Sequence, residues 1–428
     1  MLKKFKKFLV LTFISLNTIL VVGQSFNSPY SSFGLGDMSF KGFGRNRAMG
    51  GISIAMKDGN YIDFLNPASY AARDSLSLLF EFGGVGQVSQ VSTDNGSNAP
   101  WDINFSHLAF SFPISRKLSF GAGLIPYTLS DYNFVFEVSN GDELYDPEVG
   151  QLEYLFKGSG GLNEVFFGVA YEITKNLALG VNGRYIFGNL TKVQSVTLVE
   201  NPNAYHTKLD EQDILGGINF TIGLNYETQF GKDWEFGVGG YYTLKSKINQ
   251  KTEFLATNNL FLESGTSIDT LISYNTDKEK KDFPASYGLG VLFNKGDKII
   301  FGIDYKTTLW SNATIMNFES AQNSQSILLG VEYTPSPREL RSYLKRIHYR
   351  AGGYYTNSYL KVQGNQITDF GITFGVGLPI GRSRSSFNLA FDYGKRGSRE
   401  NNGILENHGV ITFSLLVYDF WFMKRKFD

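Results

Sequence analysis

Ser106 and His107 are the neighbouring residues that by type could supply a nucleophile and its base. A serine hydroxyl becomes nucleophilic when an adjacent histidine accepts its proton. The residues around this pair alternate in a way typical of a β-strand, and adjacent strand residues point to opposite faces. We therefore expect the two side chains not to hydrogen-bond without a β-bulge, and we assign no catalytic residue.

Other motifs for enzymatic chemistry are missing from the sequence. It has no His-Glu-x-x-His zinc pair, no Gly-x-x-x-x-Gly-Lys phosphate loop and no Gly-x-Ser-x-Gly elbow. The chain has no cysteine, which excludes thiol nucleophiles and iron-sulfur clusters. Gly371 to Gly377 precedes Pro379 rather than a helix, so it does not predict a phosphate site. We expect a protein that is not an enzyme and holds neither cofactor nor metal.

The charged residues give little indication of a specific site. The 40 basic residues balance the 40 acidic ones, so no nucleic-acid partner is expected. Acidic groups such as Asp142-Glu143 could bind calcium or a partner protein. The simpler interpretation is that they are solvent-exposed charges in loops. Charges on predicted inward faces fit a polar barrel interior, namely Arg184, Glu227, Asp304 and Asp392.

The N-terminus predicts export from the cytoplasm. Four lysines between Lys3 and Lys7 precede an apolar run from Phe8 to Val22, and small residues allow cleavage before Gln24. Residues 1–23 are therefore predicted to be a signal peptide, although a membrane anchor is the alternative. Since no later apolar stretch reaches about 20 residues, the mature chain is either released or embedded as strands.

Two-residue alternation predicts the fold class. From Phe220 to Phe230 the even positions are mostly apolar and the odd positions are Gly or polar. The same pattern recurs in Ile299 to Lys306 and in Phe387 to Gly394. Repeated over residues 75–420, it gives about fourteen strands of membrane-spanning length. The sequence thus predicts an all-β protein.

The connections between these strands favour an outer-membrane barrel over a sandwich. Tight turns such as Gly231-Lys232 alternate with connections near 137–161, 190–215, 248–283 and 398–407, which we expect to be long polar loops. Short periplasmic turns opposite long outer loops are typical of antiparallel transmembrane β-barrels. Both chain ends then lie in the periplasm, and residues 421–428 are a periplasmic tail.

The segment from Gln24 to Asp74 differs from the barrel in composition. It is dense in glycine, and its strand alternation is weak. A barrel of this size is wider than the eight-stranded kind that side chains fill on their own. We therefore expect residues 24–74 to fold back into the lumen as a hatch or plug.

Several short motifs resemble the FadL family of outer-membrane transporters for hydrophobic compounds. The run Gly44-Arg45-Asn46-Arg47-Ala48-Met49-Gly50-Gly51, then Asp58-Gly59 and Asn66-Pro67-Ala68, is similar to the family's N-terminal hatch. The family's strand patterns are similar to three further runs, His107 to Pro113, Gly302 to Tyr305 and Gly375 to Pro379. The two ends of the mature chain resemble those of the family's Bacteroidetes-type members. The resemblance implies a fourteen-stranded barrel with a luminal hatch.

The resemblance also implies site residues and partners. Asn66, Pro67, Gly50 and Gly51 would form the hatch and its gate, although Ser69 stands where the family commonly has glycine after Asn-Pro-Ala. Aromatic side chains would line a path for hydrophobic small molecules, for which the candidates are Phe40, Phe43 and Phe64. The barrel surface would contact outer-membrane lipid.

A second role is left open by the resemblance. Some FadL-like barrels of Bacteroidetes serve the type IX secretion system as partner or plug subunits of its translocon barrel. The connection from Ser336 to Arg346, predicted to be a short basic helix, would then be a docking element through Arg338, Arg341, Lys345 and Arg346, together with the tail Lys424-Arg425-Lys426. A solvated turn is the simpler interpretation of this connection.

Overall fold

The computed structural model describes residues 28–38, 42–93, 96–98, 101–201, 204–262, 265–296, 298–317, 321–339, 341–381 and 383–420. The predicted signal peptide, Phe40 and the tail 421–428 lie outside these residues. Among the described residues, none of the helices is long and apolar enough to cross a membrane.

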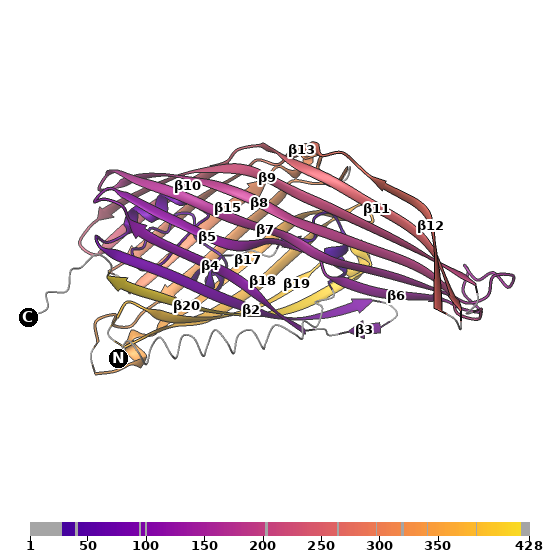
Figure 1. Ribbon diagram of the computed structural model, residues 1–428. Helices are drawn as coiled ribbons and strands as arrows, with labels where there is room; N and C mark the ends of the chain where they lie inside the picture. The colour runs from indigo at the N-terminus through magenta and orange to yellow at the C-terminus, as the bar shows by residue number, and fades with distance from the viewer. Residues whose placement is uncertain are drawn as a thin grey trace, which may run out of the picture.

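The described chain forms a closed antiparallel barrel of 14 strands (Figure 1). Most of these strands are single elements, and they follow one another around the ring in sequence order. The ring closes where β2 pairs with β20. The first half comprises β2 (Ser77–Thr93), the short β3 (Gly96–Asn98), β4 (Trp101–Pro113), β5 (Leu118–Leu129), β6 (Tyr132–Val138), β7 (Leu152–Thr174), β8 (Leu177–Leu198) and β9 (Tyr205–Phe230).

The second half contains two strands of the barrel that are built from consecutive pieces. Strands β10 (Trp234–Thr243) and β11 (Ser246–Leu262) form one, and β12 (Gly265–Asn275), β13 (Glu279–Phe283) and β14 (Ser286–Lys295) form the next. The remaining strands are β15 (Ile299–Thr308), β16 (Ser324–Tyr333), β17 (His348–Val362), β18 (Asn365–Pro379), β19 (Ser386–Arg396) and β20 (Leu405–Phe420). The prediction of an all-β, fourteen-stranded barrel is confirmed.

The faces of the wall follow the predicted alternation. On β9 the outward residues Ile222 and Leu224 are 42% and 45% exposed, whereas the inward Thr221 and Asn225 are 2% and 0% exposed. Cross-strand pairing sets each inward residue beside an inward neighbour on the next strand. The barrel therefore presents apolar side chains outward and polar ones to a filled lumen.

The wall is much taller on one side than on the other. Strands β7, β8 and β9 have 23, 22 and 26 residues, whereas β15, β16 and β19 have 10, 10 and 11. Membrane crossing needs only about 9–11 residues. Figure 1 shows β7, β8, β9, β11 and β12 continuing past the shorter strands, at the end opposite the short turns.

This extension corrects the prediction of long loops. Residues 152–161, 190–198, 205–215, 249–262 and 265–275, predicted to lie in loops, are strand. They pair with one another, for example Val196 with Thr207 and Phe254 with Glu211. Their described side chains are mostly half-exposed or exposed. Because neither face is continuously buried in a membrane or core, the sequence has no sustained apolar alternation there from which strands would be predicted.

Residues 28–38 and 42–74 lie inside the barrel and are called the luminal segment below (Figure 1). Its regular elements are short: η1 (Pro29–Ser32), β1 (Asp37–Met38), α2 (Gly44–Arg47) and η2 (Pro67–Ala72). It begins at the outer end, where Ser28 Oγ donates to Glu406 at 2.9 Å near the start of β20. It ends beside the short turns, where β2 begins.

The remaining helical turns lie at the ends of strands. At the outer end, η3 (Trp310–Asn312) and η4 (Ile315–Asn317) follow β15, and α3 (Arg399–Asn402) precedes β20. At the periplasmic end, η5 (Leu344–Arg346) precedes β17. The predicted basic helix over 336–346 is thus reduced to this single turn within the described residues.

Candidate functional site: the lumen and a break in its wall

The luminal segment is packed directly against the barrel through inward glycines. A Cβ on Gly180 would lie 2.3 Å from the backbone of Pro67, and one on Gly352 would lie 2.3 Å from the amide nitrogen of Gly50. The same crowding against the luminal segment is found at Gly121, Gly168, Gly223, Gly239, Gly290, Gly330 and Gly375. Since real Cβ atoms do not approach so closely, glycine is what lets the two backbones touch.

The predicted turn at Asn66 and Pro67 is present and is fixed to the wall. Asn66 Oδ1 accepts from the Ala68 amide at 3.1 Å, and its Nδ2 donates to the carbonyls of Ile54 at 2.6 Å and Leu224 at 3.0 Å. Ser69, the departure from the family pattern, donates to the carbonyl of Asp63 at 2.7 Å. The hydroxyl therefore strengthens this turn.

Gly50 and Gly51 form the sharp bend that follows α2. Their φ angles are 69° and 89°, in the left-handed region that favours glycine. The Gly50 amide donates to Thr373 Oγ1 on β18 at 2.8 Å. The sequence motif that contains these glycines thus marks a bend held against the wall.

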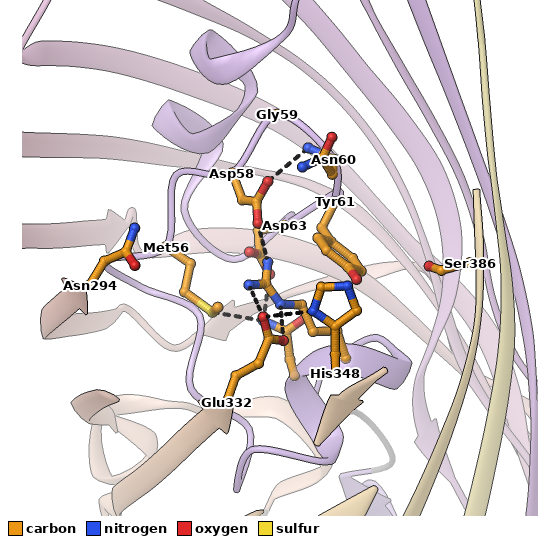
Figure 2. Close-up of polar contacts among 12 residues, drawn as sticks. Met56, Asp58, Gly59, Asn60, Tyr61, Asp63, Asn294, Glu332, His348 and Ser386 are labelled. Atoms are coloured by element: carbon orange, nitrogen blue, oxygen red, sulfur yellow. Dashed lines mark hydrogen bonds and ion pairs between the residues drawn. The ribbon is translucent and has the colours of Figure 1, made fainter. Parts of the chain in front are cut away.

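A buried ion cluster joins the luminal segment to the wall (Figure 2). Arg45 donates to both oxygens of Glu332 on β16, at 3.1 and 3.2 Å, and to Asp58 at 2.8 Å. Arg350 on β17 donates to the same carboxylate at 2.6 Å and to Tyr61 at 3.0 Å. One wall carboxylate therefore neutralises guanidinium groups from the luminal segment and from the neighbouring strand.

Burial changes the acid–base behaviour of the luminal segment. Burial alone would lower the pKa of Arg45, but Glu332 and Asp58 outweigh it and the pKa is raised, so the guanidinium stays charged. For Asp63, burial raises the pKa to about 7, against the opposing effects of Arg45 and of a 2.7 Å hydrogen bond from Asn46. Asp63 is the luminal carboxyl whose charge changes near neutral pH.

The aromatic residues predicted to line a path have different environments. Phe43 is 2% exposed and is stacked on His107, with ring centroids 4.0 Å apart. Phe64 packs against Phe43 and Phe166 and also lines a cavity above it. Phe40 lies outside the described residues.

Ser106 and His107 lie within hydrogen-bond distance, because the β-bulge that we expect such a bond to need is present. A bulge between β2 and β4 leaves Ser106 without a cross-strand partner, since Gly83 pairs with His107 and Gly84 with Phe105. Ser106 Oγ then lies 3.0 Å from His107 Nδ1, and His107 Nε2 lies 3.4 Å from Glu81. Adjacent glycines on the partner strand were the available signal for this bulge.

The residues predicted as a docking element make local contacts. Arg346 donates to the Gly381 carbonyl at 2.9 Å, and Lys345 lies 4.0 Å from Glu339. The Arg341 amide donates to Glu339 at 3.0 Å. Arg338 and Arg346 line a polar cup of about 910 Å³ at the end with the short turns, below the luminal segment.

Between β4 and β5 the wall is open over part of its height. The two strands pair only from Leu108 with Leu124 to Pro113 with Ser119. Above that point β4 continues as Trp101 to His107 and β5 as Ile125 to Leu129, without pairing to each other. The end of β5 pairs instead with the luminal segment, where Met38 opposes Thr128.

This break is caused by local irregularities on β5. Pro126 cannot donate a ladder hydrogen bond, and the next residue, Tyr127, is a bulge against β7. Beyond β5 the chain is held inward, because Ser31 Oγ donates to the Asp131 carbonyl at 2.9 Å and Ser130 Oγ donates to Ser31 at 3.0 Å. The chain between residues 118 and 138 is therefore divided into two strands, β5 and β6.

A cavity of about 490 Å³ lies at the break. Ser106 of β4, Thr128 and Leu129 of β5, and Met38 and Arg47 of the luminal segment are among its lining residues. A second cavity of about 230 Å³ lies above Phe64 and below the turns η3 and η4. The described residues contain no group of three or more His, Asp or Glu side chains arranged to hold a metal ion.

The closed 14-stranded barrel defines a class by its fold, the β-barrels with the fold of the FadL type. The P. putida toluene transporter TodX matches with a TM-score of 0.59 and 15% identity, over 91% of this chain and 100% of that one. The Ralstonia pickettii toluene transporter TbuX matches with a TM-score of 0.55 and 17% identity, over 89% of this chain and 98% of that one. A Pseudomonas aeruginosa FadL homologue matches with a TM-score of 0.52 and 10% identity, over 89% of this chain and 98% of that one.

Within this class the chain belongs to the BamG family, whose model matches residues 1–428. A search among curated proteins finds no match. At these low identities the solved structures show a shared fold, and what TodX or TbuX carries is a property of those proteins.

Proposed function

We propose that this protein resides in the outer membrane after cleavage of its signal peptide and provides a passage for hydrophobic compounds. The observation that carries the proposal is the break between β4 and β5 with a cavity behind it. A hydrophobic molecule that reaches the cavity leaves sideways through the break into the lipid, without crossing the polar periplasmic cup. The toluene transporters that share the fold support this proposal.

The luminal segment serves in this proposal as the hatch that prevents straight-through flow. Its lower part fills the barrel with a buried apolar cluster that includes Tyr61, Phe64 and Tyr70. Residues 24–74 form this domain, and Asn66, Pro67, Gly50 and Gly51 hold it in place. Pro67→Gly should loosen it and raise the permeability of reconstituted vesicles to small polar dyes. Unchanged permeability in a stably folded variant would show that this turn does not control the pore.

The lateral exit is tested by bridging the break. Because the chain has no cysteine, Ser106→Cys and Leu129→Cys introduce the sole thiols, one on each side. A short bis-thiosulfonate linker joins them through reducible bonds. We expect linking to abolish toluene accumulation in proteoliposomes and reduction to restore it.

A matched control places the same linker on the intact wall, using Ile303→Cys and Leu329→Cys, which are cross-strand partners on β15 and β16. This bridge should leave accumulation unchanged. If the bridge at the break is as harmless as the control bridge, the proposed exit is wrong.

We further infer that Ser106, His107 and Glu81 anchor the wall to the luminal segment and do not catalyse. His107 is 0% exposed beneath Phe43, and Glu81 also accepts from Ser414 Oγ at 2.9 Å. The channels that share the fold support this inference. Stoichiometric labelling of Ser106 by a fluorophosphonate probe would overturn it. The alternative role as a type IX translocon partner gains no support from the described residues.

A further inference from the structure

One row of hydroxyl groups crosses the inner wall of the cavity of about 230 Å³. Cross-strand pairing sets Thr221 beside Thr243, Thr243 beside Ser286, Ser286 beside Thr308, and Thr308 beside Ser324. All line the cavity, and this set on β9, β10, β14, β15 and β16 is called the hydroxyl row. The pair Ser326 and Thr356 lies beside it, with their oxygens 2.9 Å apart.

Aromatic rings line another part of the same cavity. Trp310 stacks on Tyr359 with centroids 4.7 Å apart and meets Phe283 edge-on at 5.9 Å, and Phe283 contacts Tyr127 at 5.8 Å. These residues are called the aromatic shelf. Tyr359 is fixed because its hydroxyl donates to the Gly36 carbonyl at 2.8 Å. The hydroxyl row meets the aromatic shelf at the end of β15, where Thr308 is followed closely by Trp310.

Charged residues around the cavity have protein partners. Arg184 forms a two-pronged ion pair with Glu164. Arg396 pairs with Asp37 at 2.8 Å and lies 3.7 Å from Asp369. Lys306 acts electrostatically on Asp304. Since these charges are already balanced, an ionised ligand would have to compete for them, whereas a neutral ligand would not.

The size of the cavity limits the ligand. At about 30 Å³ of liquid volume per water, the space suits a molecule on the order of ten non-hydrogen atoms. An aromatic ring of that size finds stacking partners on the shelf. A hydroxyl group on the ring finds donors and acceptors along the row, because each serine or threonine hydroxyl supplies both.

We propose that this cavity selects small neutral ring compounds that carry a hydroxyl group, such as phenols, over the corresponding hydrocarbons. The inference rests on the proposed function and names the substrate class of that passage. Within the row, Thr221 and Thr243 hydrogen-bond each other at 2.9 Å. A hydrocarbon in the cavity would displace water from the other hydroxyls, such as those of Thr308 and Ser324, without replacing its hydrogen bonds. Sites built to bind a substrate hydroxyl reject the analogue that lacks it for this reason.

The test uses p-cresol and toluene, which differ by one hydroxyl group. Binding of each radiolabelled compound to the full protein in lipid nanodiscs is measured by equilibrium dialysis, with empty nanodiscs subtracted. We expect p-cresol to bind at least about tenfold more tightly than toluene. A tenfold ratio of affinities corresponds to the binding free energy that one good hydrogen bond contributes. The variant Ser286→Ala with Thr308→Val should remove that preference by weakening p-cresol binding alone.

Retained toluene binding shows that the double variant is folded. The control Thr257→Val makes the same chemical change on β11, away from the cavity, and should leave the preference unchanged. Equal binding of the two compounds, binding of neither, or a preference that survives the double variant would overturn the inference. Toluene accumulation in proteoliposomes then decides separately whether the proposed passage stands, because that assay does not depend on selectivity.

Discussion

The two ends of the barrel are built on different principles. At the end with the short turns, the wall and the luminal segment are pressed together through glycines and through the carboxylate that Arg45 and Arg350 share. At the opposite end, β7, β8, β9, β11 and β12 continue past the shorter strands as paired strands whose described side chains are mostly half-exposed or exposed. The same backbone ladder runs through both regions, so the difference lies in the packing on its inner face.

This comparison indicates which contacts stabilise the protein. Hydrogen-bonded strands without a buried face contribute little net stability, because water replaces the lost bonds on unfolding. The packed end buries apolar area and charge, and losing a contact there leaves groups unpaired. We therefore expect substitutions at the packed end to cost much more than changes in the extension.

The largest effect is expected at Gly352. In Gly352→Ala the new Cβ would lie 2.3 Å from backbone atoms of Met49 and Gly50, which cannot move aside as a side chain can. The cost should exceed the roughly 1–3 kcal/mol of ordinary overpacking, and the luminal segment should become sensitive to protease. Gly409→Ala is the matched control, since its nearest atom is 4.0 Å away. Equal protease resistance in both variants would contradict direct backbone packing.

A slightly smaller effect is expected from Glu332→Gln. The change leaves the guanidinium groups of Arg45 and Arg350 buried beside a neutral amide, which typically costs about 3–5 kcal/mol. The measurement is the midpoint of thermal unfolding in detergent. Glu235→Gln, at an exposed position on β10, should leave that midpoint nearly unchanged. If both variants melt alike, the cluster does not hold the luminal segment.

Asp63 should contribute to the pH dependence of stability. Its pKa is about 7 in the folded protein and about 3.9 when unfolded, so between these values the folded state binds more protons. The free energy of unfolding should fall as pH rises from about 4 to about 7, by up to about 4 kcal/mol. Asp63→Asn should flatten this slope while still accepting from Asn46. The slope is measured by denaturant unfolding at several pH values. If Asp63→Asn leaves the slope unchanged, Asp63 is not a source of the pH dependence.

The smallest effect is expected from shortening the extension. Residues 254–274 are replaced by an Asn-Gly turn that joins Glu253 to Asn275, which are cross-strand partners. The barrel should still fold, with the free energy of unfolding changed by about 1 kcal/mol or less. Loss of the folded band in unheated gels would mean that the extension stabilises the barrel, and the contrast between the two ends would fail.

The sequence predicts the membrane part of the wall well because each strand there has one face in lipid. The alternating run from Phe387 to Gly394, for example, lies within observed β19, Ser386–Arg396. The extension is missed because residues such as Lys208, Asp210 and Glu211 lie where both faces are wet, so alternation disappears.

The site is less predictable because it depends on pairing between distant segments. The Ser106 bulge is set by the glycines of β2, and the break by the failure of β4 to pair with the upper part of β5. Glu332 and Arg350 are single charges on inward faces, which sequence alone cannot distinguish from ordinary lumen polarity. Pro126, which has no backbone donor, is the sequence signal from which the break could have been predicted.

The position of Ser28 bears on how the chain folds. Its hydrogen bond to Glu406 spans 378 residues of sequence, and that of Tyr30 to the Ile404 carbonyl spans 374. Contacts between the two ends of a chain cannot belong to a nucleus that forms during synthesis of the first half. The part of the mature protein that emerges first is thus among the last to reach its native contacts, and until then its buried surface needs protection from aggregation.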